Sequence, residues 1–271
     1  MISNKEISKP KTPAWALTAC KSFLEQAQVV NEVLDLCMRG VGSITNFPQI
    51  VSAIAKAEGT FGSKAVEEER NRAEALKERA LREINSGFST LHSQATISLW
   101  SSLESMVKDL VSDWICNRPE TLNDTSWANL KVRVGDYEPL DAEQRADYLV
   151  ELADLNLGGP LKQGVTRFEK LLETIGLGGA VSDEVRKTLF ELQQVRNVLV
   201  HRQGVADQRF CRTCAWMNMT PGQRVAINRE RYEGYVSAAY SYASELIIRT
   251  AESFGVPDMR GDLNEREISP K

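Results

Sequence analysis

The sequence predicts an all-α protein, and two patterns support this fold class. Apolar residues recur at three- and four-residue spacings through most of the 271 residues, which is the periodicity of amphipathic helices. Glycine and proline fall mainly between these periodic segments, where they end one helix before the next begins. A composition of 42% hydrophobic and 26% charged residues is typical of a globular chain and excludes a wholly disordered one.

The expected helices follow one another along the whole chain. They are predicted over residues 13–39, 47–57, from 63 onward, 89–116, 141–154, 161–175, 183–203 and 229–254. The first follows Thr12 and Pro13, a candidate N-cap residue and a proline at the first helical position. The helix from Ser63 is highly charged, and two interpretations of it stay open: a solvated amphipathic helix, or a coiled coil that binds a partner.

The middle of the chain is less regular. Pro119 stops the helix at 89–116, and residues 117–140 are polar and hold two prolines, so we expect a loop there. Within it, the alternation from Leu130 to Val134 indicates one short strand. Glycine-rich breaks at 158–159 and 176–179 separate the helices that follow.

Charge and cysteine content restrict the function. A formal net charge of −4 argues against a nonspecific polycation for nucleic acid, although a local basic site remains possible. Five irregularly spaced cysteines suit a reducing cytoplasm, and no secretory signal or membrane-spanning segment is expected. Cys211 and Cys214 form a lone C-x2-C pair, so we expect no metal site, and no glycine-rich nucleotide motif predicts a cofactor. His92 has no neighbouring pattern typical of a catalytic triad and is expected to be structural.

The helix at 183–203 carries an arginine in an unusual position. On an ideal helix, Arg196 falls within the same arc as Leu192 and Val195, which belong to the apolar stripe. A positive charge on this face is costly unless an anion or a carboxylate meets it. A structural salt bridge or a side chain that snorkels at the edge of the stripe is the simpler explanation, and a site for an anionic ligand is the other.

Two further polar residues lie on another face of this helix. Asn197 and His201 are four residues apart, and the ideal projection separates Arg196 from His201 by roughly 140°. One helix is therefore expected to bring Arg196 and His201 to a single phosphate only by bending, by fraying near Gly204, or with help from a second subunit.

The segment Arg196-Asn-Val-Leu-Val-His201 resembles the Arg-x4–6-His signature of the HEPN superfamily, all-helical domains that include many RNA-cleaving toxins and defence proteins. The run from Glu191 into Gly204 is similar to the late helix of that family, and Pro221–Gly222 and the tyrosine-containing last helix also resemble bacterial members. The helix from Leu99 to Leu110 is similar to their early helix. The resemblance covers roughly residues 88–254.

The resemblance implies an antiparallel helical bundle. A HEPN-like helical domain is then expected at 88–256, with an additional N-terminal helical region at 1–87 that includes the charged amphipathic helix. Residues 257–271 are polar and are expected to form a flexible tail.

The resemblance also implies a metal-independent endoribonuclease in which two protomers line one cleft. Arg196 would stabilise the phosphate, His201 would transfer protons, and Asn197 would orient or bind. The products would be a 2′,3′-cyclic phosphate and a 5′-hydroxyl. RNA, a second copy of the chain and an antitoxin or regulatory partner are the expected partners, in a toxin or phage-defence setting. The alternative is a noncatalytic HEPN-like module that binds RNA or a protein.

Basic and aromatic residues near the motif are candidates for RNA contacts. The basic candidates are Arg186, Lys187, Arg202 and Arg209. Trp216, Tyr232 or Tyr235 would offer a ring for base stacking, but aromatic residues at helical spacing also fill cores, and both interpretations stay open.

Overall fold

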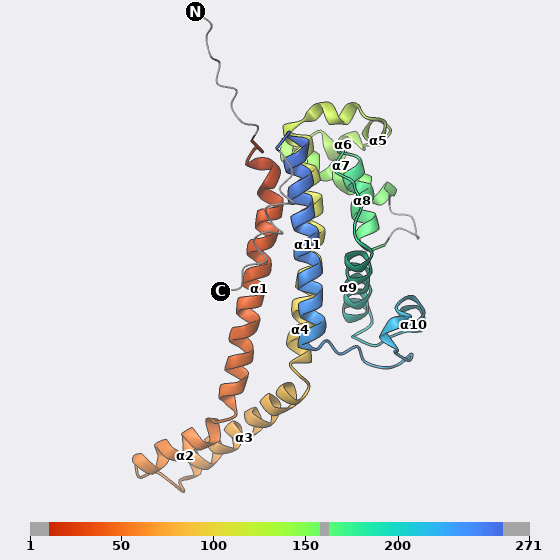
Figure 1. The fold of residues 1–271 in the computed structure, drawn as a ribbon. Helices are drawn as coiled ribbons and strands as arrows, with labels where there is room; N and C mark the ends of the chain where they lie inside the picture. The colour runs from red at the N-terminus through yellow and green to blue at the C-terminus, as the bar shows by residue number, and fades with distance from the viewer. Residues whose placement is uncertain (1–10, 158–162, 257–271) are drawn as a thin grey trace, which may run out of the picture. The chain divides into compact units, whose positions relative to one another are not determined.

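The protein is all-α, as predicted. The structure is a computed structural model that describes residues 11–157 and 163–256, and these residues form eleven α-helices, two 3-10 helices and no β-strand (Figure 1). The predicted tail at 257–271 lies outside the described residues. None of the described helices combines the length and apolar character needed to cross a membrane.

Five long helices account for most of the structure. They are α1 (Trp15–Ile44), α3 (Lys64–Asn85), α4 (Ser89–Asn117), α9 (Asp183–His201) and α11 (Arg229–Ser253). The shorter α-helices are α2 (Phe47–Ala57), α5 (Thr125–Ala128), α6 (Val134–Tyr137), α7 (Ala142–Leu157), α8 (Val165–Glu173) and α10 (Gln208–Thr213), and the 3-10 helices are η1 (Pro119–Asn123) and η2 (Ala215–Met217).

Local sequence signals explain where several helices begin. Ser63 caps α3 by accepting a hydrogen bond from the Val66 amide. Asp141 and Gln144 form a reciprocal capping box before α7, because each side chain accepts a hydrogen bond from the backbone amide of the other. Helix α1 continues past its predicted end at Gly40 and also includes Gly42, since glycine weakens a helix without necessarily stopping it.

The prediction of a strand from Leu130 to Val134 is wrong. This segment is irregular up to Arg133, and α6 begins at Val134. A strand needs a neighbour for its backbone groups, and the only bridge in the described residues joins Val205 to Arg224. The expected loop at 117–140 also contains short helices, η1 and α5 among them.

The chain divides into two compact units, each assembled from segments that are distant in sequence. Within the described ranges, unit 1 comprises residues up to 26, 100–193 and from 237, whereas unit 2 comprises 27–99 and 194–236. Helices α1, α4, α9 and α11 contribute residues to both units.

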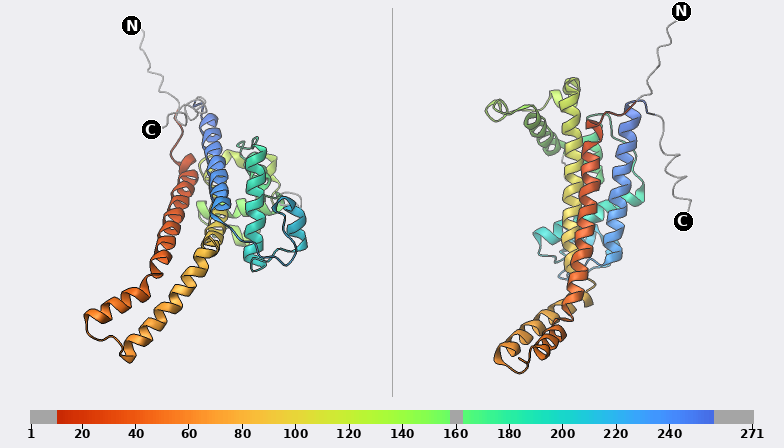
Figure 2. Two further views of the ribbon diagram at one scale, coloured as in Figure 1. Left: turned by 60° about the horizontal axis from the view of Figure 1, so that its bottom comes forward. Right: turned by 90° about the vertical axis from the view of Figure 1, so that its left-hand side faces the viewer.

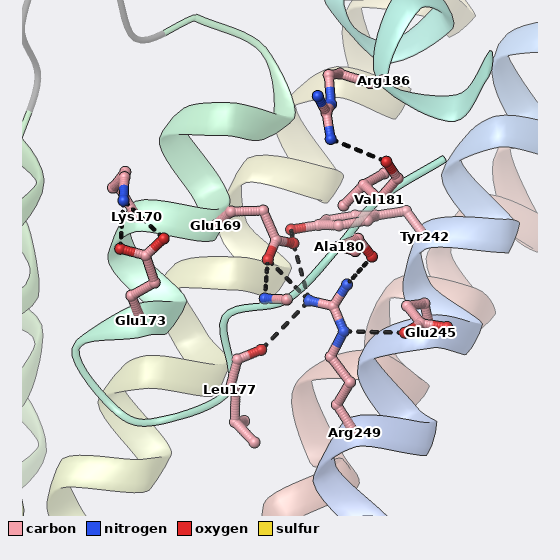
Figure 3. A network of polar contacts seen from close by, with 11 residues as sticks. Glu169, Lys170, Glu173, Leu177, Ala180, Val181, Arg186, Tyr242, Glu245 and Arg249 are labelled. Carbon is pink, nitrogen blue, oxygen red and sulfur yellow. Dashed lines mark hydrogen bonds and ion pairs between the residues drawn. The ribbon is translucent and has the colours of Figure 1, made fainter. Parts of the chain in front are cut away.

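Unit 1 contains an aromatic core and a buried ion pair. The rings of Trp100, Phe168 and Tyr242 stack in series, with centroid separations of 5.2 and 6.3 Å. Beside them, Arg249 Nη1 lies 2.8 Å from Glu169 Oε2, and both side chains are nearly fully buried (Figure 3). The Tyr242 hydroxyl donates to Glu169 Oε1 at 2.8 Å.

This ion pair fixes the turn before α9. Arg249 donates to the carbonyl oxygens of Leu177 and Ala180, while Glu169 accepts from the Gly179 amide at 2.7 Å (Figure 3). Burial raises the pKa of Tyr242 well above its ordinary value, and the neighbouring Glu169 carboxylate raises it further. The charges of Arg249 and Glu169 thus neutralise each other, and backbone groups satisfy further hydrogen bonds of both side chains, as buried charges require.

In unit 2, α2 and α3 form an antiparallel helical hairpin (Figure 2). Gly87 and Phe88, both with positive φ, separate α3 from α4. His92 is buried just after this break, with its Nδ1 atom 3.1 Å from the Gly87 carbonyl oxygen and its ring against Tyr232. The Tyr232 hydroxyl donates to Asn31 at 2.8 Å, so His92 belongs to a structural cluster.

We expect Arg249→Met to lower the free energy of unfolding by about 3–5 kcal/mol, because it leaves the Glu169 carboxylate buried without a counter-charge. Arg229→Met, on the same helix, removes an exposed pair with Glu233 and should leave the stability nearly unchanged. Urea denaturation followed by circular dichroism measures both. Equal losses in the two variants would contradict the role given to the buried pair.

Candidate functional site

The last two turns of α9, in unit 2, hold the three residues expected to carry chemistry. Arg196 and Asn197 are half-buried, and His201 is exposed at the helix end. Val195, just before Arg196, and Val198, just after Asn197, are buried, so the inward face of this helix is anchored in the core. Arg196 therefore lies at the boundary between the core and the surface, although the helical projection placed it within the arc of the apolar stripe.

The structure brings all three side chains together within one chain. Arg196 Nη1 donates to Asn197 Oδ1 at 3.3 Å and lies 3.5 Å from His201 Nε2. A guanidinium group can only donate, so this contact needs the Nε2 atom of His201 to be unprotonated. The expectation that one straight helix cannot direct Arg196 and His201 to one point is wrong, because the long arginine side chain spans the angular separation. The helical projection consequently gives no reason to require a second subunit.

Arg196 has no carboxylate partner among the described residues. Its Nε atom is buried and makes no hydrogen bond there, and no ion pair of Arg196 occurs in the same part of the chain. One half of the simpler explanation from sequence, a structural salt bridge, is therefore wrong for the described residues. The other half, a side chain that snorkels at the edge of the stripe, agrees with the half-buried position of Arg196. A partly buried guanidinium with an unsatisfied donor is instead suited to receive an anion.

The end of α9 is held by a short backbone clip. Gln203 and Gly204 adopt positive φ, and the Gly204 amide donates to the Val198 carbonyl oxygen to close the helix. The chain then pairs with residues 222–225: Val225 donates to Gly204, and Ala206 donates to Gln223, at 2.8 and 2.9 Å. This clip fixes the backbone immediately after His201.

Sequence reasoning missed one basic residue at this clip. Arg224 pairs with Val205 across the isolated bridge, and its Nη1 atom donates to the Gln203 carbonyl oxygen at 3.5 Å. Arg224 thus contacts a residue two positions after His201, and the contact arises from a pairing between segments distant in sequence. No local pattern signals such a pairing, because a single bridge leaves no periodicity.

The candidate RNA-contacting residues divide between the two units. In unit 2, Arg202 is exposed and lies 3.6 Å from Asp207, which caps α10, and Arg209 is exposed on α10. Arg186 and Lys187 are exposed in the first turns of α9, which belong to unit 1, and Arg186 donates to the Val181 carbonyl oxygen (Figure 3).

The three aromatic candidates for base stacking differ in exposure. Tyr232 and Tyr235 are only 3% and 1% exposed, so the hypothesis that either ring stacks on an RNA base is wrong. Trp216, on η2, is 40% exposed and offers a ring at the surface.

The described residues show no group that is suited to a metal ion. No cluster of three or more His, Cys, Asp or Glu side chains in the described ranges has the required arrangement. Cys214 is buried, Cys211 is partly buried, and all five cysteines are free.

We expect Gly204→Ala to destabilise the protein by about 1 kcal/mol or more, because the φ of +75° at Gly204 is unfavourable for a residue with a Cβ atom. Gly40→Ala is the matched control: Gly40 lies inside α1 with open space around its Cα, so alanine should stabilise the helix slightly. Thermal unfolding of both variants measures the difference. A Gly204→Ala variant as stable as the wild type would show that this φ is not required.

Comparison of the chain with protein-family models, with curated proteins and with solved structures gives no match.

Proposed function

We propose that the protein is a HEPN-like, metal-independent endoribonuclease that uses Arg196, Asn197 and His201. The observation that carries the proposal is the combination at the end of α9: a partly buried guanidinium without a carboxylate partner in the described residues, 3.5 Å from an exposed imidazole. An anion would give the guanidinium a counter-charge, and proton transfer near neutral pH is the characteristic chemistry of the imidazole.

A phosphodiester in RNA suits this pair. The forked guanidinium of Arg196 binds two phosphate oxygens and stays charged as negative charge develops on them. His201, at the surface, is accessible to the 2′-hydroxyl or to the departing 5′-oxygen. The 2′-oxygen attacks phosphorus, the bond to the 5′-oxygen breaks, and a 2′,3′-cyclic phosphate and a 5′-hydroxyl result. DNA lacks the 2′-nucleophile and would remain intact.

The contact between Asn197 and Arg196 supports a positioning role for the amide. Asn197 Oδ1 accepts from the Nη1 atom of Arg196, which limits the orientation of the guanidinium before substrate binds. Reduced freedom of this kind lowers the entropic cost of binding the phosphate.

Neighbouring residues supply a surface along which RNA would continue. Arg202, Arg209 and Arg224 are exposed around the clip and α10, and Trp216 offers a ring for an unpaired base. The free cysteines are compatible with action in the cytoplasm, in a toxin or phage-defence setting where an antitoxin or regulatory partner would limit cleavage. The resemblance to the HEPN superfamily, and not the geometry of one chain, is the reason to propose that two subunits each contribute an Arg196–His201 pair to a composite site.

We expect purified protein to cleave single-stranded RNA in EDTA, and Arg196→Ala and His201→Ala each to reduce the rate by roughly 10²- to 10⁴-fold. Arg229→Ala is the matched control, because it removes an exposed arginine that pairs with Glu233 on α11 and is not part of the proposed site. Analysis of the new ends should find 2′,3′-cyclic phosphates, and a 2′-deoxy nucleotide at the cleaved position should block the reaction.

Two results would contradict the proposal. Undiminished cleavage by both alanine variants would indicate another site or a contaminant. RNA binding that depends on Arg196, without cleavage of any RNA, would favour the noncatalytic binding module instead.

We expect Trp216→Ala to weaken the binding of single-stranded RNA by about 5- to 100-fold, the range for loss of one stacked base. Tyr235→Phe is the control because its ring is buried and keeps its shape. Fluorescence anisotropy with a labelled 2′-O-methyl RNA measures affinity without cleavage. Equal affinities for the wild type and Trp216→Ala would exclude this residue from the RNA surface.

A further inference from the structure

The α2–α3 hairpin, Phe47–Asn85, exposes its largest apolar side chains. Phe47, Ile50 and Ile54 are spaced by three and four residues on one face of α2, and they are 40%, 49% and 52% exposed. We call these three residues the arm stripe. The hairpin's buried residues are small: Pro48 and Ala55 on α2, and Ala73 and Ala80 on α3. A contiguous apolar face on a surface helix, with little core beneath it, is typical of an interaction surface.

Helix α3 adds apolar and charged residues to the same side of the hairpin. In an ideal antiparallel pair whose buried faces meet at Ala55 and Ala73, Leu76 projects to the side of the arm stripe. Leu76 is 43% exposed. Glu69 and Arg72 project to this side as well, and they form an exposed pair at 3.4 Å within α3.

We propose that this face binds the same face of a second copy of the chain, through a twofold axis that crosses the hairpin at right angles to its helices. For the arm stripe to pack on itself, the axis passes between Ile50 and Val51. Phe47 then meets the partner subunit's Ile54, and Ile50 of one subunit lies beside Ile50 of the partner subunit. The stripe is therefore self-complementary.

The charges on α3 favour a second copy over an unrelated partner. Residues 58–63 form the turn that joins the two helices. The axis crosses α2 between Ile50 and Val51, and the positions equally far from the middle of the turn on the other side are Arg70 and Asn71, so the axis crosses α3 between these two residues. In that register Glu69 faces the partner subunit's Arg72, and the twofold repeats the pair. Leu76 faces the partner subunit's Ala65. One register thus matches the apolar residues of α2 and the opposite charges of α3 at the same time.

This pairing gives the charged helix from Ser63 a role, and it does not depend on the proposed ribonuclease activity. It extends one of the two interpretations that the sequence left open, a coiled coil that binds a partner. Four helices, two from each subunit, would enclose the arm stripes in a common core.

The first test compares two substitutions on adjacent residues of α2. Ile50→Glu places a charge within the proposed interface and should raise the dimer dissociation constant by about tenfold or more. Gln49→Glu adds the same charge on another face of the helix, where Gln49 is exposed, and should leave dimerisation unchanged. Sedimentation equilibrium of the full chain measures both, and circular dichroism checks that each variant is folded.

The second test uses the reciprocal charge pair. Glu69→Arg places two arginines opposite each other across the axis, and Arg72→Glu places two glutamates there, so each variant alone should dimerise about two- to tenfold more weakly. When the two variants are mixed, every pair is again opposite in charge, and heterodimers should form preferentially. The double variant Glu69→Arg, Arg72→Glu should dimerise like the wild type.

Several results would overturn the proposal. A strictly monomeric wild-type chain would do so, as would a dimer equally sensitive to Ile50→Glu and Gln49→Glu. Random pairing in the mixture, with no preference for heterodimers, would show that Glu69 and Arg72 do not face each other across a twofold axis.

Discussion

Two arginines placed near the core show the constraint on which this account depends: a buried guanidinium must be paired with negative charge. Arg249 is enclosed by Glu169, Glu245 and backbone carbonyl oxygens, and burial by itself lowers its pKa whereas these carboxylates raise it overall. That network holds the turn from which α9 begins. Arg196, on α9 itself, has an amide and an imidazole as partners and no carboxylate in the described residues. The first arginine is satisfied by the fold, and the second is left able to bind a ligand.

Much of the fold was predictable because it depends on local signals. The start of α9 after Ser182, the second helix at Phe47–Ala57 and the start of α4 at Ser89 follow from caps, proline positions and apolar periodicity. The end of α1 and the absence of a strand at 130–133 were not predicted correctly. The first depends on the tolerance of a helix for glycine, and the second on whether a partner strand exists elsewhere in the chain.

The residues of the candidate site were chosen from the sequence, but the geometry of their side chains was not predictable from it. A helical projection places Cα atoms and correctly sets Arg196 beside the core, but it ignores the reach of a long side chain, which brings the guanidinium to His201. Arg224 was missed because the bridge to Val205 joins distant segments. The exposure of Trp216 and the burial of Tyr232 also depend on tertiary packing, since aromatic residues at helical spacing fit either environment.

The central claim is that Arg196 and His201 bind one phosphodiester together, and NMR of the imidazole ring protons tests it most directly. The chain has two histidines, and His92 is buried in the structural cluster, so its signal serves as an internal reference. On addition of a noncleavable 2′-O-methyl RNA, the His201 signal should shift while that of His92 stays in place, and Arg196→Ala should abolish the shift. An unchanged His201 signal at saturating RNA, or an equal shift in Arg196→Ala, would contradict the claim.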